Sequence, residues 1–197
     1  MLDGVRVRLA EILEELRPFV ARGTPIVGLE PSCLLTLRDE LPAMFPHSLD
    51  ARRLAGQAML FDELISTRTS SDALPALQGR ALVHGHCHQK ALTGMSAELS
   101  ILGRSTGLVV AAPDTGCCGM AGAFGYGAER FELSRKIGER VLLPVVRESS
   151  PDTTIIADGF ACRAQIRQFC PDRRPLHLAE VLNSAFQESP AAHEHSR

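Results

Sequence analysis

The feature that most constrains the fold is a repeated order in which a short apolar segment is followed by a loop that contains cysteine. Four such segments, each suited to a short buried strand, occupy residues 25–29, 81–83, 107–112 and 154–157. Helical patterns separate them, and strands alternating with helices favour an α/β fold with a mainly parallel sheet flanked by helices. Because loops after parallel strands meet at one sheet edge, we expect distant thiols to gather in one region.

The remaining chain is expected to be largely helical. Apolar spacing predicts one helix over residues 5–21, stopped by Gly23, and a second that runs through Leu34 and Leu41. The other expected helices are 49–65, 93–103, 127–148, one through Ile166 and Phe169, and 177–186. Residues 127–148 are expected to form the longest amphipathic helix despite Pro144, and 66–72 a surface loop.

The composition is that of an ordinary globular chain. Its 197 residues can bury a full core, and a net charge of -2 gives no general attraction for nucleic acid. The N-terminus lacks a signal-peptide pattern, and no apolar run approaches the roughly 20 residues of a membrane helix, so a cytoplasmic location is expected. In a reducing compartment, the six cysteines are expected to act as metal ligands or redox-active thiols.

The segment 114–125 holds two adjacent cysteines, Cys117 and Cys118, among glycines. Adjacent cysteines rarely form a disulfide with each other because the ring strains the peptide, so we expect two thiolates offered to one metal centre or redox partner. The glycines would let backbone N–H groups approach the sulfurs. For either cysteine alone, a small buried residue in a tight turn would be the better explanation, but the four other cysteines argue against it.

Segments 24–38 and 153–167 resemble each other. Their Thr, Ile, Cys and Arg positions coincide at a constant offset of 129, since 162 − 33 and 167 − 38 are both 129. This offset suggests two similar α/β units, the first represented only by its last strand and helix, whereas chance similarity is the alternative. We therefore expect a partial first unit with a connecting helix over 1–75, a complete unit over 76–188 and a disordered tail over 189–197.

Four cysteines follow the order Cys, Cys-Cys-Gly, Cys, with gaps of 30 and 44 residues (117 − 87 and 162 − 118). They lie in the words Gly-His-Cys87-His-Gln, Thr-Gly-Cys117-Cys118-Gly-Met and Gly-Phe-Ala-Cys162-Arg, and Leu-Glu-Pro-Ser-Cys33 precedes them. Together these words resemble the cysteine-rich CCG domain of heterodisulfide reductase and related proteins. They are most similar to the C-terminal iron-sulfur region of FAD-linked 2-hydroxy-acid dehydrogenases and the glycolate oxidase iron-sulfur subunit.

The resemblance, which covers about residues 2–182, implies an electron-transfer role. It implies an iron-sulfur cluster of the 4Fe-4S type, including its non-cubane form, and an FAD carried by a preceding domain or a partner subunit rather than by this chain. The implied partners are that flavoprotein and an electron acceptor, and membrane association would come through partners. No nucleotide fingerprint, phosphate loop or Ser-His-Asp set is present in the sequence, so no substrate-oxidising site is expected here.

The chain departs from the family pattern at two positions. The pattern ends in Cys-x-x-Cys, but Gly159 stands in the first position of that pair, and Glu30 stands at the corresponding position of the first unit. Fewer thiolates are therefore available than the full pattern supplies, which leaves the cluster type open. An earlier CCG motif and a flavin domain are also absent, so we expect a C-terminal piece of a larger oxidoreductase, whose exposed sheet edge a second copy can cover as a homodimer.

The resemblance makes Cys117 and Cys118 the first ligand candidates, with Cys87 and Cys162 next. Cys33 either completes the site or remains a free thiol, and Cys170, which matches no motif, is expected to be structural. Soft thiolates also suit zinc, so a zinc-binding or metal-free module that docks a flavoprotein is the alternative function.

Polar side chains around the cysteines have two interpretations each. His84, His86 and His88 alternate with Cys87, and one of them can bind metal, but hydrogen bonding to the centre is favoured, with His86 and His88 as the residues assigned to it. Lys90 either offsets thiolate charge or is a surface lysine. Asp114 and Asp158 are expected to cap turns or helices rather than to act as acids or bases.

Overall fold

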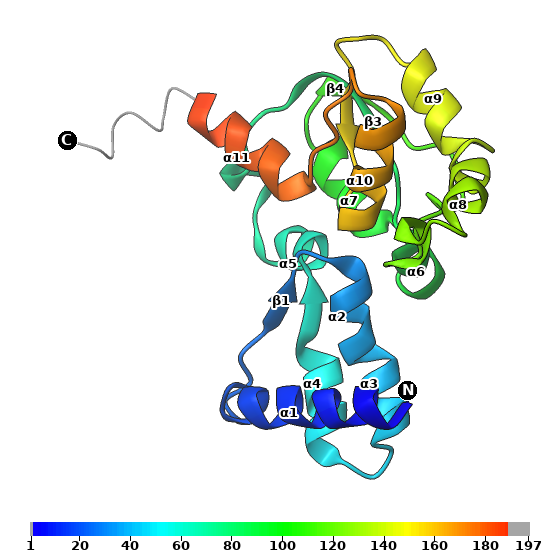
Figure 1. Cartoon of the computed structure of the whole chain (residues 1–197). Coiled ribbons are helices and arrows are strands. Elements are labelled where there is room, and N and C mark those ends of the chain that lie inside the picture. The colour runs from blue at the N-terminus through cyan, green and yellow to red at the C-terminus, as the bar shows by residue number, and fades with distance from the viewer. Residues whose placement is uncertain (1, 189–197) are drawn as a thin grey trace.

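The computed structural model describes residues 2–188, which form two lobes (Figure 1). The N-terminal lobe, residues 2–60, contains α1 (Leu2–Ala21), β1 (Ile26–Gly28), α2 (Pro31–Arg38), α3 (Glu40–Met44), α4 (Leu49–Gln57) and β2 (Ala58–Leu60).

The C-terminal lobe, residues 61–188, carries the larger sheet. Its elements are α5 (Phe61–Arg68), η1 (Ser71–Ala73), β3 (Gln78–Val83), α6 (Cys87–Leu92), α7 (Ser96–Gly103), β4 (Gly107–Ala111), η2 (Phe124–Tyr126), α8 (Phe131–Gly138), α9 (Leu142–Glu148), β5 (Thr154–Ile156), α10 (Phe160–Phe169) and α11 (Leu178–Glu188).

The predicted α/β class with parallel strands flanked by helices is confirmed. In the C-terminal lobe the strand order is β4–β3–β5, and both pairs are parallel, with Leu82 opposite Ala111 and Ile155. In the N-terminal lobe β1 and β2 form a separate parallel pair. The strands therefore belong to two sheets, and the predicted first unit has one strand more than its sequence pattern indicated.

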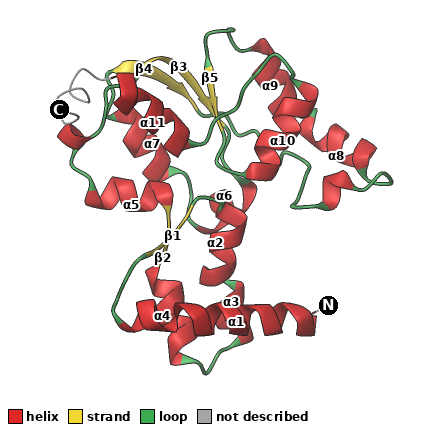
Figure 2. Cartoon of the chain, turned by 60° about the vertical axis from the view of Figure 1, so that its left-hand side comes forward, coloured by secondary structure: helices red, strands yellow, loops and turns green. Residues whose placement is uncertain are grey.

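Alternation along β3 explains how the larger sheet is covered. Leu82 packs with α9 and α10 on one face, whereas Ala81 and Val83 pack with α7 and α11 on the other. Figure 2 shows the helices on these two sides of the strands. Because a sheet buried on both faces needs apolar residues at successive positions, its strands are continuous hydrophobic runs, as Ala81–Val83 are.

The N-terminal lobe is built around the apolar stripe of α1. Leu9, Leu13 and Val20 are buried against α3 and α4, and Gly23, at φ +73°, ends the chain's first helical stretch in the left-handed region. The prediction of this helix is confirmed. Among residues 2–188, no helix has the length and apolar character that crossing a bilayer requires.

The predicted helix over 49–65 is wrong, because the strand β2 interrupts it. Ala58 pairs with Ile26, and Leu60 packs with the buried Leu35 of α2, so the segment gains sheet pairing and burial at once. A local signal marked the break: Glu63 accepts a hydrogen bond from the Leu60 N–H at 2.8 Å, which is the arrangement at the start of a new helix.

The predicted continuous helix over 127–148 is also wrong. The chain forms α8 and α9 instead, and Pro144 lies in the first turn of α9, where its missing N–H is tolerated and its ring does not face a preceding helical carbonyl. The surface loop predicted at 66–72 is shorter than expected, because α5 continues to Arg68. The prediction for the tail from Ser189 onward falls outside the described residues.

Candidate metal centre

The carboxyl edge of the larger sheet gathers side chains from three strand ends. His84 and Cys87 follow β3, Cys117 and Cys118 follow β4, and Cys162 lies in the first turn of α10 after β5. Parallel strands deliver such loops to one edge, which is why residues up to 78 positions apart (162 − 84) meet here. The gathering of thiols that the strand pattern predicted is therefore what the fold produces.

The thiols lie in a continuous series. Cys117 interacts directly with Cys87 and Cys118, and Cys118 also interacts with Cys162. Cys118 and Cys162 are 4% and 1% exposed, whereas Cys87 and Cys117 are half-buried. The group thus has an inner pair, shielded from water, and an outer pair that faces the surface.

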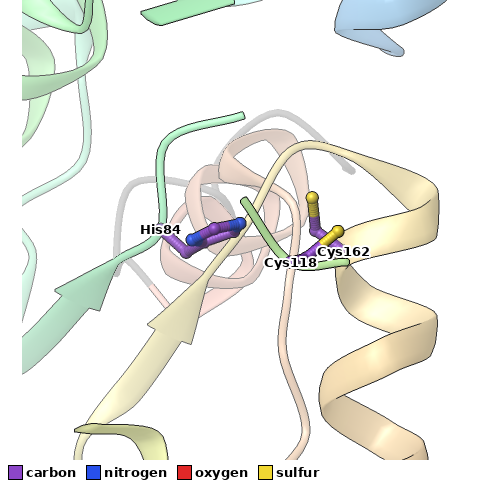
Figure 3. Close-up of side chains that lie close together, drawn as sticks. All are labelled: His84, Cys118 and Cys162. Atoms are coloured by element: carbon purple, nitrogen blue, oxygen red, sulfur yellow. The ribbon is translucent and has the colours of Figure 1, made fainter. Parts of the chain in front are cut away.

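His84 joins the inner pair. The ligand atoms of His84, Cys118 and Cys162 all lie within 4.8 Å of one another, and Figure 3 shows these side chains converging from a strand end, a loop and a helix. The backbone of His84 is fixed because its N–H donates to the carbonyl of Ile156 at 2.8 Å, which extends the pairing of β3 with β5.

Glycine conformations shape the double-cysteine loop. Gly119 adopts φ +98°, and a Cβ there would collide with the backbone oxygen of Ser134. Only glycine fits, and its N–H donates to Cys117 Sγ at 3.3 Å. The glycine that follows the cysteines therefore does what the sequence suggested, since it brings a backbone N–H to a sulfur.

The close approach of the four cysteine side chains shifts their pKa values in opposite directions. The neighbouring Cys118 thiol is the main reason that the pKa values of Cys117 and Cys162 are lowered far below the ordinary value. Conversely, Cys117 raises the pKa of both Cys118 and Cys87. The thiolate is the form that binds metal, so the lowered pKa values of Cys117 and Cys162 favour binding of a soft cation.

The outer pair opens to the surface. Cys87 lines a cavity of about 510 Å³ together with Lys90, Met95 and other residues, and Cys117 lines one of about 260 Å³. Lys90 Nζ lies 2.9 Å from Asp114 Oδ1 and donates to the carbonyl of Gly116 at 3.2 Å. Lys90 thereby holds the loop that carries the outer thiol Cys117.

The two histidines expected to hydrogen-bond the centre lie in different places. His86 is buried as the N-cap of α6, beside Gly159 and Cys162, so it borders the thiols. His88 instead faces the N-terminal lobe, where its ring lies within 4.8 Å of carboxylate oxygens of Asp39 and Glu40. Of these two imidazole rings, only that of His86 lies beside the thiols, whereas His88 approaches Cys87 through its backbone N–H.

Cys33 occupies the first turn of α2, and its thiol is exposed. None of the thiol interactions among residues 2–188 involves it. Cys170 is 3% exposed and packs in the core behind the sheet, as expected of a structural residue.

The two aspartates cap backbone, as predicted. Asp114 Oδ1 accepts a hydrogen bond from the N–H of Gly116, and Asp158 Oδ1 accepts one from the N–H of Leu178 at the start of α11. Asp158 does not cap α10, which follows it directly. Instead, the carboxylate of Glu30 in the other lobe accepts from the Phe160 N–H at 2.6 Å.

Sequence reasoning missed Thr115 and one connection, and it named His84 only as one of three histidines of which one can bind metal. Thr115, buried beside His84, was not predicted, and His84 was not among the residues assigned to the centre, yet the Thr115 hydroxyl lies 2.5 Å from His84 Nδ1. The order His84-Gly85-His86 directly after a strand was a signal for both rings. Nothing local in the sequence linked Glu30 to Phe160, because 130 residues separate them.

The fold and site define an α/β protein with a thiol-rich centre at the carboxyl edge of a parallel sheet. The chain is 27% identical over 173 residues to D-2-hydroxyglutarate dehydrogenase of Escherichia coli, and 28% identical over 169 residues to the protein of that name from Pseudomonas putida. It is also 26% identical over 168 residues to one subunit of the anaerobic glycerol-3-phosphate dehydrogenase of Escherichia coli.

These alignments cover most of this chain but a minor part of its relatives. They include 83–85% of this chain, whereas the chain spans 16% of the length of the two D-2-hydroxyglutarate dehydrogenases and 41% of the glycerol-3-phosphate dehydrogenase subunit. No protein-family model matches the chain. The similarity is therefore to a segment of larger dehydrogenases.

Proposed function

We propose that this chain is an electron-transfer module of a flavin-linked 2-hydroxy-acid oxidoreductase, with an iron-sulfur centre held by Cys87, Cys117, Cys118 and Cys162. The observation that carries the proposal is the convergence of these thiols from three strand ends. The similarity of the chain to a minor part of larger dehydrogenases supports a module rather than a complete enzyme.

An iron-sulfur cluster supplies one-electron transfer, and the protein's part is to hold it, limit water and set its potential. The buried inner pair and the Gly119 N–H on Cys117 fit that part. We place the centre in a unit formed by residues 76–188. The flavin would belong to a preceding domain or a partner subunit, and the half-exposed outer pair would face the electron acceptor.

A zinc centre with a structural or docking role is the second candidate. The observation in its favour is that the ligand atoms of His84, Cys118 and Cys162 all lie within 4.8 Å of one another. Tetrahedral zinc with bonds of about 2.3 Å to sulfur separates its ligand atoms by about 3.8 Å, so small movements would close this group around one ion.

Metal analysis of anaerobically purified protein distinguishes the two functions. The electron-transfer proposal expects iron and acid-labile sulfide in comparable amounts and visible absorption that dithionite bleaches. Stoichiometric zinc without iron or sulfide would contradict it and support the structural role. The substrate of the complete oxidoreductase would then be sought with the flavoprotein partner present.

A further inference from the structure

His84 is a buried imidazole whose second nitrogen has no assigned role. The side chain is 2% exposed, and Nδ1 lies 2.5 Å from the hydroxyl of Thr115, itself 3% exposed. Within residues 2–188, the buried Nε2 has no nitrogen or oxygen partner, and the His84 side chain interacts with the Cys162 sulfur. A metal ion bound by that sulfur would also satisfy Nε2.

The surroundings of Nε2 identify the kind of ligand. Its ring lies with the sulfurs of Cys118 and Cys162 in a group spanning at most 4.8 Å between ligand atoms (Figure 3). Two soft sulfurs and a neutral imidazole form a donor set for a transition-metal ion. No described carboxylate belongs to this group, so a hard cation such as Mg²⁺ or Ca²⁺ does not fit it.

Thr115 is placed to hold the imidazole in the form that binds metal. An imidazole that ligates through Nε2 carries its proton on Nδ1 and donates that proton to a nearby oxygen, which fixes the ring. The Thr115 hydroxyl is at that position. It belongs to the same loop as Cys117 and Cys118, so the loop that supplies thiols also orients the histidine.

Position 159 cannot supply a donor beside Cys162. A Cβ at this position would lie 2.5 Å from His86 Cδ2 and 3.0 Å from Cys162 Sγ. The ring of His86 therefore occupies the space that a side chain at 159 would need. A further ligand beside Cys162 has to come from another element, and β3 provides it through His84.

We propose that His84 is a metal ligand through Nε2, positioned by Thr115, so that the centre is a mixed imidazole and thiolate site. The inference rests on the proposed metal centre but not on which metal it holds. Because a neutral imidazole takes the place of an anionic thiolate, a redox-active centre would be easier to reduce than one with thiolates alone.

X-ray absorption at the edge of the metal that the protein retains tests this directly. The wild-type spectrum is expected to show the multiple-scattering pattern of about one imidazole per metal site, and His84→Ala is expected to lose it. His88→Ala is the matched control, because it removes a nearby imidazole that faces Asp39 and Glu40 instead. An unchanged imidazole pattern in His84→Ala would overturn the proposal.

Thr115 gives a second test that keeps the ligand in place. Thr115→Val removes the oxygen and is expected to weaken Co²⁺ binding by about 10-fold or more in chelator competition, whereas Thr115→Ser keeps the oxygen and most of the affinity. Equal affinity in the Val and Ser variants would contradict the positioning role. Circular dichroism of metal-free protein identifies variants that fail to fold.

The outcomes separate the two proposals. Zinc with an imidazole signal would refute electron transfer but leave His84 as a ligand. An iron-sulfur centre without an imidazole signal would refute the His84 assignment but leave electron transfer. Failure to bind metal after reconstitution with ferrous iron and sulfide, and after addition of Co²⁺, would overturn both.

Discussion

The two similar segments, residues 24–38 and 153–167, are called units below; they share a local structure but differ in the surroundings of their cysteines. In both, a short strand leads through a turn into a helix, as β1 and α2 or as β5 and α10, and both place a cysteine in the first helical turn. Yet Cys162 is 1% exposed among other thiols, whereas Cys33 is exposed to solvent. The same position in the same motif therefore lies among other thiols in one unit only.

The neighbouring strand accounts for the difference. β5 pairs with β3, which is followed by His84 and Cys87, whereas β1 pairs with β2, which runs directly into α5 without a cysteine. A strand–turn–helix unit supplies one donor at a helix start, and the adjacent loops must supply the rest. Comparing matched residues of the two units therefore tests which properties come from the unit and which from its neighbours.

The largest effect is expected from replacing the two equivalent cysteines. Cys162→Ser removes a buried inner donor, so metal binding is expected to fall by at least the 10–100-fold that changes outside the ligand shell already cause. Cys33→Ser is expected to leave metal content unchanged. Metal per chain after anaerobic purification measures both, and equal losses would show that the two units do contribute alike.

The next largest effect concerns the apolar residues by which the helices of the two units pack. At the offset of 129 residues, Ile166 corresponds to Leu37. Ile166 is fully buried behind the larger sheet, while Leu37 is only partly buried between two small clusters. Ile166→Ala is expected to cost about 2–5 kcal/mol of unfolding free energy, and Leu37→Ala clearly less. Urea unfolding of the metal-free proteins gives both values, and a larger loss for Leu37→Ala would reverse the comparison.

A pH-dependent effect arises where the lobes meet. Burial, aided by the charge of Asp158, raises the pKa of Asp62 from 3.8 to about 6. Between pH 4 and 6 the folded chain keeps a proton that the unfolded chain has lost, so stability falls as the pH rises, by up to about 3 kcal/mol. Asp62→Asn is expected to remove this slope and to be more stable than wild type at pH 7.5.

Urea unfolding at pH 4.5 and 7.5 checks this expectation. The exposed Asp72→Asn serves as the control for removing a surface carboxylate. A wild-type slope that persists in Asp62→Asn would assign the pH dependence to another group, with Glu98, whose pKa is also raised by burial, as the next residue to test.

The smallest effect concerns the cap that the two units share. Glu30 accepts from Ser32 N–H and Oγ in its own unit and from the Phe160 N–H of the other. Glu30→Ala is expected to cost about 1–2 kcal/mol, the usual range for a lost cap, whereas Glu30→Gln keeps an acceptor and should lose less. Thermal unfolding measures the stability lost in both variants. The control is Glu11→Ala, which removes an exposed ion pair with Arg8. A smaller loss of stability for Glu30→Ala than for Glu11→Ala would show that the shared cap does not stabilise the fold.

The sequence predicted the parts of this molecule that depend on local pattern. Period and apolar content located the strands of both sheets except β2, because a three-residue strand such as Ala58–Leu60 does not differ from a buried helical turn in periodicity. Loop position predicted the gathering of Cys87, Cys117, Cys118 and Cys162. The directions of the histidine side chains were harder to predict. Whether His84 or His88 faces the thiols depends on the exact residues at which β3 ends and α6 begins, and sequence patterns do not fix such boundaries to a single residue.

The spacing of the proposed donor residues along the chain also sets the order in which they become available during synthesis. Cys87, Cys117 and Cys118 leave the ribosome before Cys162, which follows Cys118 by 44 residues (162 − 118), and β5 must then pair with β3 before the inner pair is complete. At about 5–20 residues per second, this interval lasts several seconds. During synthesis, the early thiols therefore wait for Cys162, and the proposed centre would be filled only after β5 has joined the sheet.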